Sequence, residues 1–253
     1  MKRKHEQEEK KINTEDAYPD REAVLHFAAT TGKHRLLDYL LLQGVDIETP
    51  CPRGDTPLLA ALRCDQQECC VVLINRGADI EARTRTKKTP LIIASRRGNE
   101  RICQILIDKG ADVNAYDDQR DTSLIAASYN KRNGVCKLLI RNGADINAHN
   151  DNRWTALHYA VRDDNISIVK YLLSSARVDM TDRDGKTPLS IAKMYNYKNM
   201  ISLLENHIIT ETLSGVISRG LDDGFKFTDF LIKEIYDPRL FLFVAHFALK
   251  REV

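Results

Sequence analysis

Arginine and tyrosine recur at one fixed interval in this 253-residue chain. The column consists of Arg63, Arg96, Tyr129 and Arg162, each 33 residues after the one before. Arginine binds carboxylates and phosphates through parallel hydrogen bonds, and both residue types are enriched among the side chains that dominate protein interfaces. The column therefore indicates a site for an acidic or phosphorylated group. A set of exposed polar side chains without a binding role is the alternative interpretation.

A second group of candidate binding residues lies between the members of this column. The third 33-residue segment is rich in basic residues, which are Arg83, Arg85, Lys87, Lys88, Arg96 and Arg97. Aromatic residues follow at Tyr116 and at Trp154, the chain's single tryptophan. Trp154 occupies a position where other segments carry Asp or Lys. We interpret it as an anchor for a partner, and packing along the next turn is the alternative.

The sequence carries no pattern typical of an enzyme active site. It contains no glycine-rich phosphate loop, no His-Glu-x-x-His sequence and no nucleophile elbow. Cys69 and Cys70 are adjacent, but they lack the second His or Cys pair that a zinc site needs. We therefore expect a non-catalytic protein that uses no cofactor and no metal.

The helices that must position the candidate residues can be read in the third segment. Thr89 is a favourable N-cap, and Pro90 suits the first helical position, where no backbone N–H is needed. Gly98 can end this inner helix in a left-handed conformation. A second apolar stretch at helical spacing follows, and Gly110 ends it. Each segment is therefore expected to form two short helices and a turn.

The same markers recur along the chain at or near the 33-residue period. Thr-Pro-Leu stands at 56, 89 and 187, Leu-His at 25 and 157, and Gly-Ala-Asp at 77, 110 and 143. A period in this range is typical of stacked helical arrays, and the quoted residues closely resemble the ankyrin repeat. The resemblance implies an all-α fold, an ankyrin-repeat solenoid of helix–turn–helix repeats joined by extended turns.

The resemblance also implies roles within each repeat. The arginine and tyrosine column would face a concave groove, which makes it a candidate interface. His26 and His158 would satisfy backbone groups between repeats rather than act in catalysis. The periodic aspartates are expected to form turns, and these are Asp79, Asp112 and Asp145.

We divide the chain into three parts. Residues 1–16 are charged and are expected to be disordered. Residues 17–207 hold six ankyrin repeats, the first and last of which are degenerate. Residues 208–253 are expected to form helices, at about 209–219 and 228–235 and from Asp237 onward. These helices either cap the last repeat or dock a second protein.

In several repeats another residue replaces the glycine after the inner helix, namely Asp65, Lys131, Asp164 or Asn196.

Three cysteines follow the same period. Cys70, Cys103 and Cys136 lie 33 residues apart, and Leu37 and Val169 occupy the same position in flanking repeats. A position that accepts Leu, Val or Cys is an apolar core position, where a free thiol behaves as a small hydrophobic group. We therefore expect these three thiols to be buried and unpaired.

The net charge and the length of the apolar runs reduce the range of functions expected for this chain. The formal net charge of +2 gives no global preference for nucleic acid or acidic membranes, and no apolar run approaches the ~18 residues of a membrane span. We expect an intracellular, cytoplasmic protein, with the nucleus, or a host cytosol for a pathogen effector, as alternatives. Its expected function is that of an adaptor or scaffold binding an acidic or phosphorylated partner segment in the groove. Nucleic-acid or nucleotide binding through the basic third repeat is the alternative.

Overall fold

The computed structural model of the protein describes residues 20–222. The tail predicted at 1–16 and the helices predicted at 228–235 and from Asp237 lie outside these residues. The chain divides into two compact units, Met1–Ala156 and Leu157–Val253, and each is described by itself.

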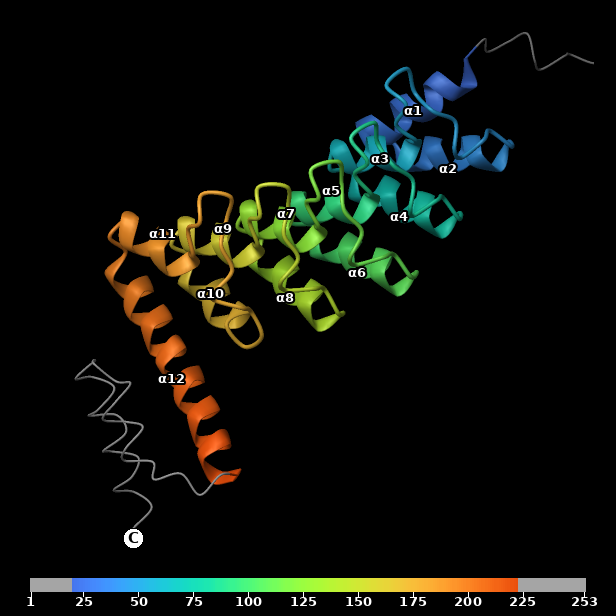
Figure 1. Cartoon of the computed structure of the whole chain (residues 1–253). Coiled ribbons are helices and arrows are strands. Elements are labelled where there is room, and N and C mark those ends of the chain that lie inside the picture. The colour runs from blue at the N-terminus through green and yellow to red at the C-terminus, as the bar shows by residue number, and fades with distance from the viewer. Residues whose placement is uncertain (1–19, 223–253) are drawn as a thin grey trace, which may run out of the picture. The chain divides into compact units, whose positions relative to one another are not determined.

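The described part of the first unit is built from four helix pairs. Its helices are α1 (Arg21–Thr31), α2 (His34–Leu42), α3 (Pro57–Arg63), α4 (Gln67–Asn75), α5 (Pro90–Arg97), α6 (Glu100–Asp108), α7 (Ser123–Tyr129) and α8 (Asn133–Arg141). The odd-numbered helices form an inner row and the even-numbered helices an outer row, and within each row a helix contacts the next (Figure 1). Each pair therefore buries its apolar side chains against its neighbours.

The second unit continues the same pattern from the unit boundary. Its helices are α9 (Ala156–Arg162), α10 (Ile166–Leu172), α11 (Pro188–Met194) and α12 (Lys198–Asp222). Across residues 20–222 there is no β-strand, and only two isolated bridges occur, Tyr116–Thr122 and His149–Thr155. The predicted all-α architecture of paired helices and extended turns is confirmed.

Threonine begins the inner helices, as the sequence predicts. The Oγ1 atom of Thr89 accepts a hydrogen bond from the backbone N–H of Ile92 at 3.3 Å, and Thr56 and Thr122 cap α3 and α7 in the same way. Proline follows the cap in α3, α5 and α11, where its missing N–H leaves no donor unsatisfied.

Left-handed residues end the inner helices. Gly98 follows α5 with φ 87°, and the residues that replace glycine elsewhere also have positive φ, namely Asp65, Lys131, Asp164 and Asn196. Asp and Asn tolerate this conformation better than lysine, whose Cβ is crowded and whose side chain gives no local compensation. Lys131, with φ 58°, is therefore strained.

The periodic cysteines lie in the core between the two helix rows. Cys70, Cys103 and Cys136 are free thiols and are buried, so the sequence prediction is confirmed. Burial raises the pKa of each of these thiols to about 12. Cys69 is also buried, and burial raises its pKa to about 11, whereas Cys64 is exposed.

Turns between repeats are joined by a periodic set of hydrogen bonds. The carboxylate of Glu48 accepts from the backbone N–H of Asp79 at 2.7 Å, and Glu81 accepts from the N–H of Asp112 at 2.9 Å. The same aspartates fold their own turns, because Asp79 Oδ1 accepts from the N–H of Glu81 at 2.8 Å. The predicted turn role of these residues is confirmed.

The two repeat histidines also behave as predicted. The His26 ring lies 2.7 Å from the carbonyl oxygen of Thr49, at the start of the next repeat. His158 is fully buried, and burial lowers its pKa, while hydrogen bonds to the backbone of Lys186 and Met180 partly oppose this shift. Both rings therefore bridge neighbouring repeats.

The C-terminal end of the described chain differs from the prediction. We expected a separate helix near residues 209–219, but α12 runs from Lys198 to Asp222 without a break. The physical reason is that residues 198–214 contain neither glycine nor proline, so no helix-breaking residue separates the last repeat from the helix expected at 209–219. Its first turns pack through the buried Met200 and Leu204.

We predict that Cys103→Val will fold with nearly wild-type stability, because Val169 occupies the equivalent core position. Cys103→Asp should unfold the protein, since it buries an unpaired charge. Circular dichroism and thermal melting measure both effects. Rapid labelling of Cys70, Cys103 and Cys136 by a thiol reagent in the native protein, at the rate of the exposed Cys64, would contradict the burial.

Lys131→Gly is expected to raise the free energy of unfolding by about 0.5–1 kcal/mol, because glycine adopts the left-handed conformation without the Cβ conflict and its larger entropy loss offsets only part of the gain. Asp65→Gly is the matched control, and a smaller gain is expected there because aspartate tolerates this backbone. Urea unfolding at equilibrium measures both. A less stable Lys131→Gly protein would show that the lysine is not strained.

Candidate partner-binding surface

Three inner helices of the first unit, α3, α5 and α7, expose only their last residues. In α5, residues 90–95 are buried and Arg96 and Arg97 are exposed. In α7, residues 123–128 are buried and Tyr129 is exposed. Arg63 ends α3 and is also exposed. We call Arg63, Arg96, Arg97 and Tyr129 the inner-helix row.

Arg63 already has an acidic partner within its own repeat. Its guanidinium donates to the carboxylate of Asp55 at 2.6 Å, and only 6% of the Asp55 side chain is exposed. The guanidinium of Arg97 donates to the backbone carbonyl of Arg63. A ligand at Arg63 would therefore compete with a preformed ion pair.

Arg162 does not occupy the environment that we predicted for it. It is half-buried rather than exposed, and its guanidinium pairs with Asp163 at 3.1 Å and lies 5.1 Å from the centre of the Tyr159 ring. The adjacent carboxylate and ring hold the side chain within its own repeat. Arg162 also belongs to the second unit, which is described by itself, so the inner-helix row is defined from the first unit alone.

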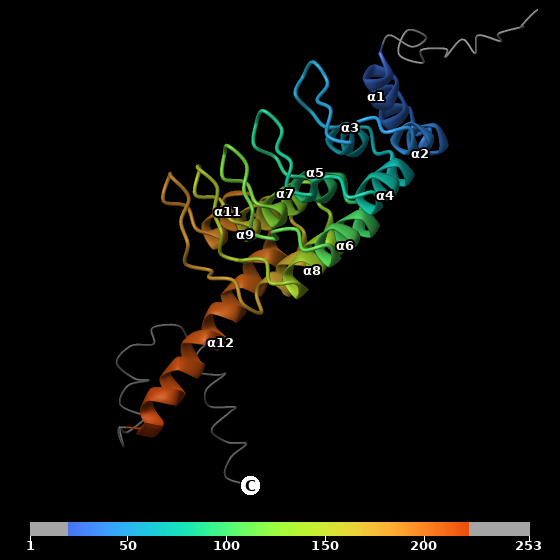
Figure 2. The same cartoon turned by 90° about the vertical axis from the view of Figure 1, so that its right-hand side faces the viewer.

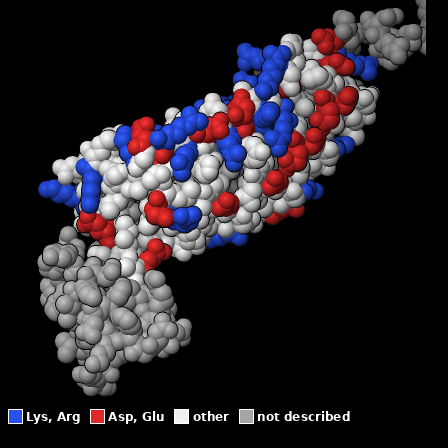
Figure 3. Space-filling view, viewed as in Figure 1, with Lys and Arg blue, Asp and Glu red and all other residues white. Residues whose placement is uncertain are grey.

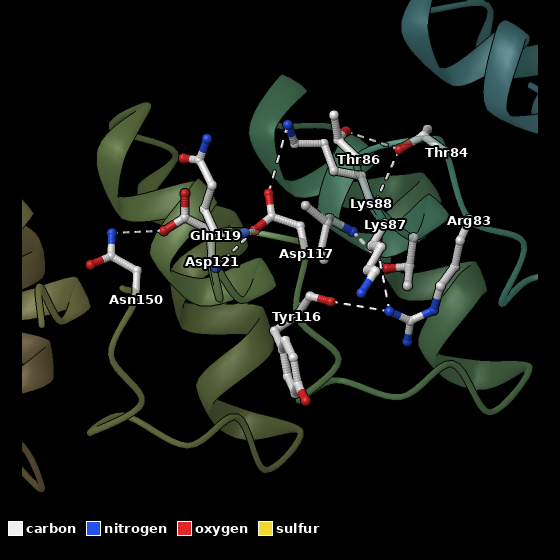
Figure 4. Close-up of polar contacts among 12 residues, drawn as sticks. Arg83, Thr84, Thr86, Lys87, Lys88, Tyr116, Asp117, Gln119, Asp121 and Asn150 are labelled. Atoms are coloured by element: carbon white, nitrogen blue, oxygen red, sulfur yellow. Dashed lines mark hydrogen bonds and ion pairs between the residues drawn. The ribbon is translucent and has the colours of Figure 1, made fainter. Parts of the chain in front are cut away.

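A polar network joins the hairpins that follow α4, α6 and α8 (Figure 4). Lys88 lies 3.6 Å from a carboxylate oxygen of Asp117, which is almost fully buried. Further along, Asn150 donates to the carboxylate of Asp121 at 2.9 Å. Burial raises the pKa of Asp121, and the Asn150 hydrogen bond and the positive charges of Lys88 and Arg96 partly oppose this.

Two other basic residues of the third repeat also bridge hairpins. Arg83 donates to the backbone carbonyl of Tyr116 at 3.1 Å, as Figure 4 shows. Arg85 donates to the carbonyl of Pro52 in the preceding hairpin at 3.0 Å. Arg83, Arg85 and Lys88 therefore each hold one hairpin to another, a role that the sequence analysis did not assign to them.

The two candidate aromatic anchors differ in exposure. Tyr116 is half-exposed, and the guanidinium of Arg120 lies 5.5 Å from the centre of its ring. Trp154 is partly buried, and its backbone N–H donates to Asn150 at 3.0 Å. Tyr116 thus offers more surface to a partner than Trp154 does.

The sequence analysis missed a strained position at the tip of each hairpin. Lys87, Arg120 and Arg153 lie 33 residues apart, and all three have positive φ, between 57° and 62°. The equivalent residue is glycine at Gly54 and Gly185. The signal was present in the sequence, because each of these residues stands two positions before the threonine that caps the next inner helix. We call Lys87, Arg120 and Arg153 the tip row.

Two kinds of structural feature are absent from residues 20–222. This part of the chain holds no group of three or more His, Cys, Asp or Glu side chains that could bind a metal ion. None of its helices is long and apolar enough to cross a membrane.

Comparison with known proteins agrees with this geometry. The sequence matches the family described as ankyrin repeats (3 copies) over residues 5–84, 25–117, 81–150 and 124–212. A similar solved structure is an ankyrin repeat domain from Acinetobacter baumannii AYE, at 29% sequence identity and a TM-score of 0.69. That match covers 74% of this chain and 98% of the other. The comparison with curated proteins gave no match.

The hairpin network gives a prediction with an internal control. Asp117 Oδ1 accepts from the backbone N–H groups of Gln119 and Asp121 at 3.0 and 2.9 Å. One repeat later, Asn150 Oδ1 accepts the two equivalent hydrogen bonds, from the N–H groups of Asn152 and Trp154. Asp117→Ala should therefore lower the free energy of unfolding by about 2 kcal/mol, because two partly buried backbone donors lose their acceptor.

Asp117→Asn keeps the accepting oxygen and should lose less than about 1 kcal/mol. Equilibrium urea unfolding of both proteins measures the difference. Equal losses in the two variants would mean that the charge of Asp117, and not its accepting oxygen, supports the hairpin.

Proposed function

The chain belongs to the ankyrin-repeat family, whose repeats indicate a protein–protein interaction module, and from this premise we propose that it is a non-catalytic adaptor. Its inner-helix row would bind an acidic or phosphorylated segment of a partner protein. Such an adaptor would act in the cytoplasm, or in a host cytosol if a pathogen delivered it as an effector.

The burial pattern of α5 and α7 carries this proposal. Both helices bury every residue up to the last turn and then expose only Arg96, Arg97 and Tyr129. Side chains that add nothing to the core are free to vary without loss of the fold, and surface substitutions change stability by less than about 0.5 kcal/mol. Two guanidinium groups beside a tyrosine match the composition of interface residues that dominate affinity.

Electrostatics favours Arg96 as the main anchor within the row. Arg63 is paired with the nearly buried Asp55 at 2.6 Å, so its charge is largely compensated. Arg96 acts on Asp121 only as one of several neighbouring charges. A partner carboxylate or phosphate can therefore bind Arg96 with less loss of existing contacts.

Nucleic acid is the competing ligand for a basic third repeat. Arg83, Arg85 and Lys88 would then have to leave carbonyl or carboxylate partners within the protein to bind phosphates. Binding would also weaken steeply as salt is raised, because phosphate contacts release counterions.

The proposal predicts that Arg96→Glu with Tyr129→Ala abolishes partner binding without changing the fold. The wild-type and variant proteins would be used as bait in a pull-down read by mass spectrometry, followed by affinity measurement with the captured protein. Affinity should fall at least tenfold, since removing an interface arginine can cost ~2 kcal/mol or more. Arg141→Glu is the matched control, because Arg141 is an exposed arginine in the last turn of the outer helix α8.

An unchanged set of captured proteins, bound with unchanged affinity, would exclude the inner-helix row as the binding site. Capture that disappears after nuclease treatment would instead support the nucleic-acid alternative. Circular dichroism and the melting temperature of each variant must match those of the wild type for either conclusion.

A further inference from the structure

The hairpin tips of the first unit share one backbone geometry but not one residue type. The N–H groups of Gly54, Lys87, Arg120 and Arg153 each donate to the carbonyl three residues earlier, at 2.7, 2.9, 3.0 and 2.8 Å. All four residues have positive φ. The turn therefore accepts glycine at Gly54, but the next three hairpins carry a basic residue there.

These basic residues are not what the turn requires. A left-handed backbone is unfavourable for a residue with a Cβ atom, and neither lysine nor arginine has the short polar side chain that compensates Asn or Asp. Residues with a strained backbone cluster at binding sites, so the recurrence of a basic residue at three equivalent tips points to a role for these side chains, whereas Lys131 is strained alone.

Backbone hydrogen bonds between hairpins fix the tips in a row. The N–H of Asp118 donates to the carbonyl of Thr86 at 3.2 Å, and the N–H of Asp151 donates to the carbonyl of Gln119 at 3.0 Å. Each of these contacts lies next to a tip residue, Lys87 in one case and Arg120 in the other. Figure 2 shows the hairpins projecting side by side from the inner helices. The row is thus ordered before any partner binds.

The tip side chains are available to a partner. Lys87, Arg120 and Arg153 are all exposed. Within the described part of the chain, neither Lys87 nor Arg153 forms an ion pair with a carboxylate. Arg120 lies over the exposed face of Tyr116, at 5.5 Å from the ring centre.

Acidic residues separate the basic tips. Asp118 and Asp151 are exposed and stand beside the tips of the preceding hairpins through the backbone contacts described above. Figure 3 shows basic and acidic side chains alternating along the upper rim of the view. A uniformly charged polymer such as nucleic acid would meet repulsion at every acidic residue, whereas a peptide can alternate charged and neutral side chains.

We infer that the tip row binds an extended segment of a partner protein in which carboxylates recur at every third residue. Stacked repeats place equivalent residues ~10 Å apart, which is the distance between packed helices. A peptide in the polyproline II conformation advances ~3.1 Å per residue with three residues per turn, so side chains three residues apart lie on one face and are ~9 Å apart. Carboxylates at positions i, i+3 and i+6 would then meet Lys87, Arg120 and Arg153 in turn.

This inference deepens the proposed interaction function but does not depend on the inner-helix row. It also specifies the spacing of carboxylates along the partner segment, which the inner-helix row does not specify. Glycine at the tips should remove the basic side chains that bind the partner. It should also stabilise the fold, because glycine adopts the left-handed backbone without strain.

The test uses the full chain with Lys87→Gly, Arg120→Gly and Arg153→Gly combined. The probe is a fluorescent peptide of about twelve residues with Glu at every third position and Ser or Thr between, a spacing that follows from the three residues per turn of the polyproline II conformation. A peptide of the same composition with its Glu residues contiguous is the control ligand. Lys131→Gly is the control protein, since it relieves the same left-handed strain away from the tips.

We expect the wild type to bind the spaced peptide at least tenfold more tightly than the contiguous one in fluorescence anisotropy. The triple variant should melt at a higher temperature and bind the spaced peptide at least tenfold more weakly. Lys131→Gly should melt higher and bind as the wild type does. The tip row is refuted if the wild type binds neither peptide, binds both equally, or keeps its affinity in the triple variant.

The Arg96→Glu/Tyr129→Ala protein separates this inference from the proposed function. If that protein loses the spaced peptide while the triple variant keeps it, the peptide lies on the inner-helix row and the tip row is refuted. If the triple variant alone loses the peptide, the tip row is supported and the inner-helix row fails for this ligand. Stronger competition by single-stranded DNA than by unlabelled peptide would refute both protein-binding assignments.

Discussion

Each helix pair in this protein can bury its apolar residues only against a neighbouring pair, and this stacking constraint determines the rest of the structure. It explains why Cys70, Cys103 and Cys136 recur in the core and why Thr56, Thr89 and Thr122 cap equivalent helices. It also explains the periodic hydrogen bonds between turns, because backbone donors at the junction between repeats need acceptors from the adjoining repeat, as Glu48 and Glu81 provide.

The same constraint defines where a partner can bind. Positions that face a neighbouring repeat must remain apolar or hydrogen-bonded, so α3, α5 and α7 expose side chains only at their ends, and the hairpins add exposed side chains at their tips. The inner-helix row and the tip row occupy these two places. Their chemistry differs, since Arg96 and Tyr129 add exposed side chains to an unstrained helix, whereas Lys87, Arg120 and Arg153 hold a backbone that would suit glycine better.

The periodic features of the structure could be predicted from the sequence, because the period itself carries the physical information. The helix caps, the left-handed residue at Gly98, the buried thiols and the role of His26 all follow from equivalent positions in other repeats. Non-periodic features could not be read in this way. Arg162 pairs with Asp163 through a local geometry, and α12 is continuous because no glycine or proline interrupts residues 198–214. The left-handed backbone at the hairpin tips is not revealed by residue charge, which is the property for which Lys87 was considered.

We propose that the inner-helix ends and the hairpin tips of the first unit form the partner-binding face. Hydrogen exchange read by mass spectrometry, on the protein with and without its captured partner, tests this claim most directly. Binding at this face predicts slower exchange in residues 83–98 and 115–130, with little change in the outer helices α4, α6 and α8. Protection confined to those outer helices, or to the second unit, would contradict it.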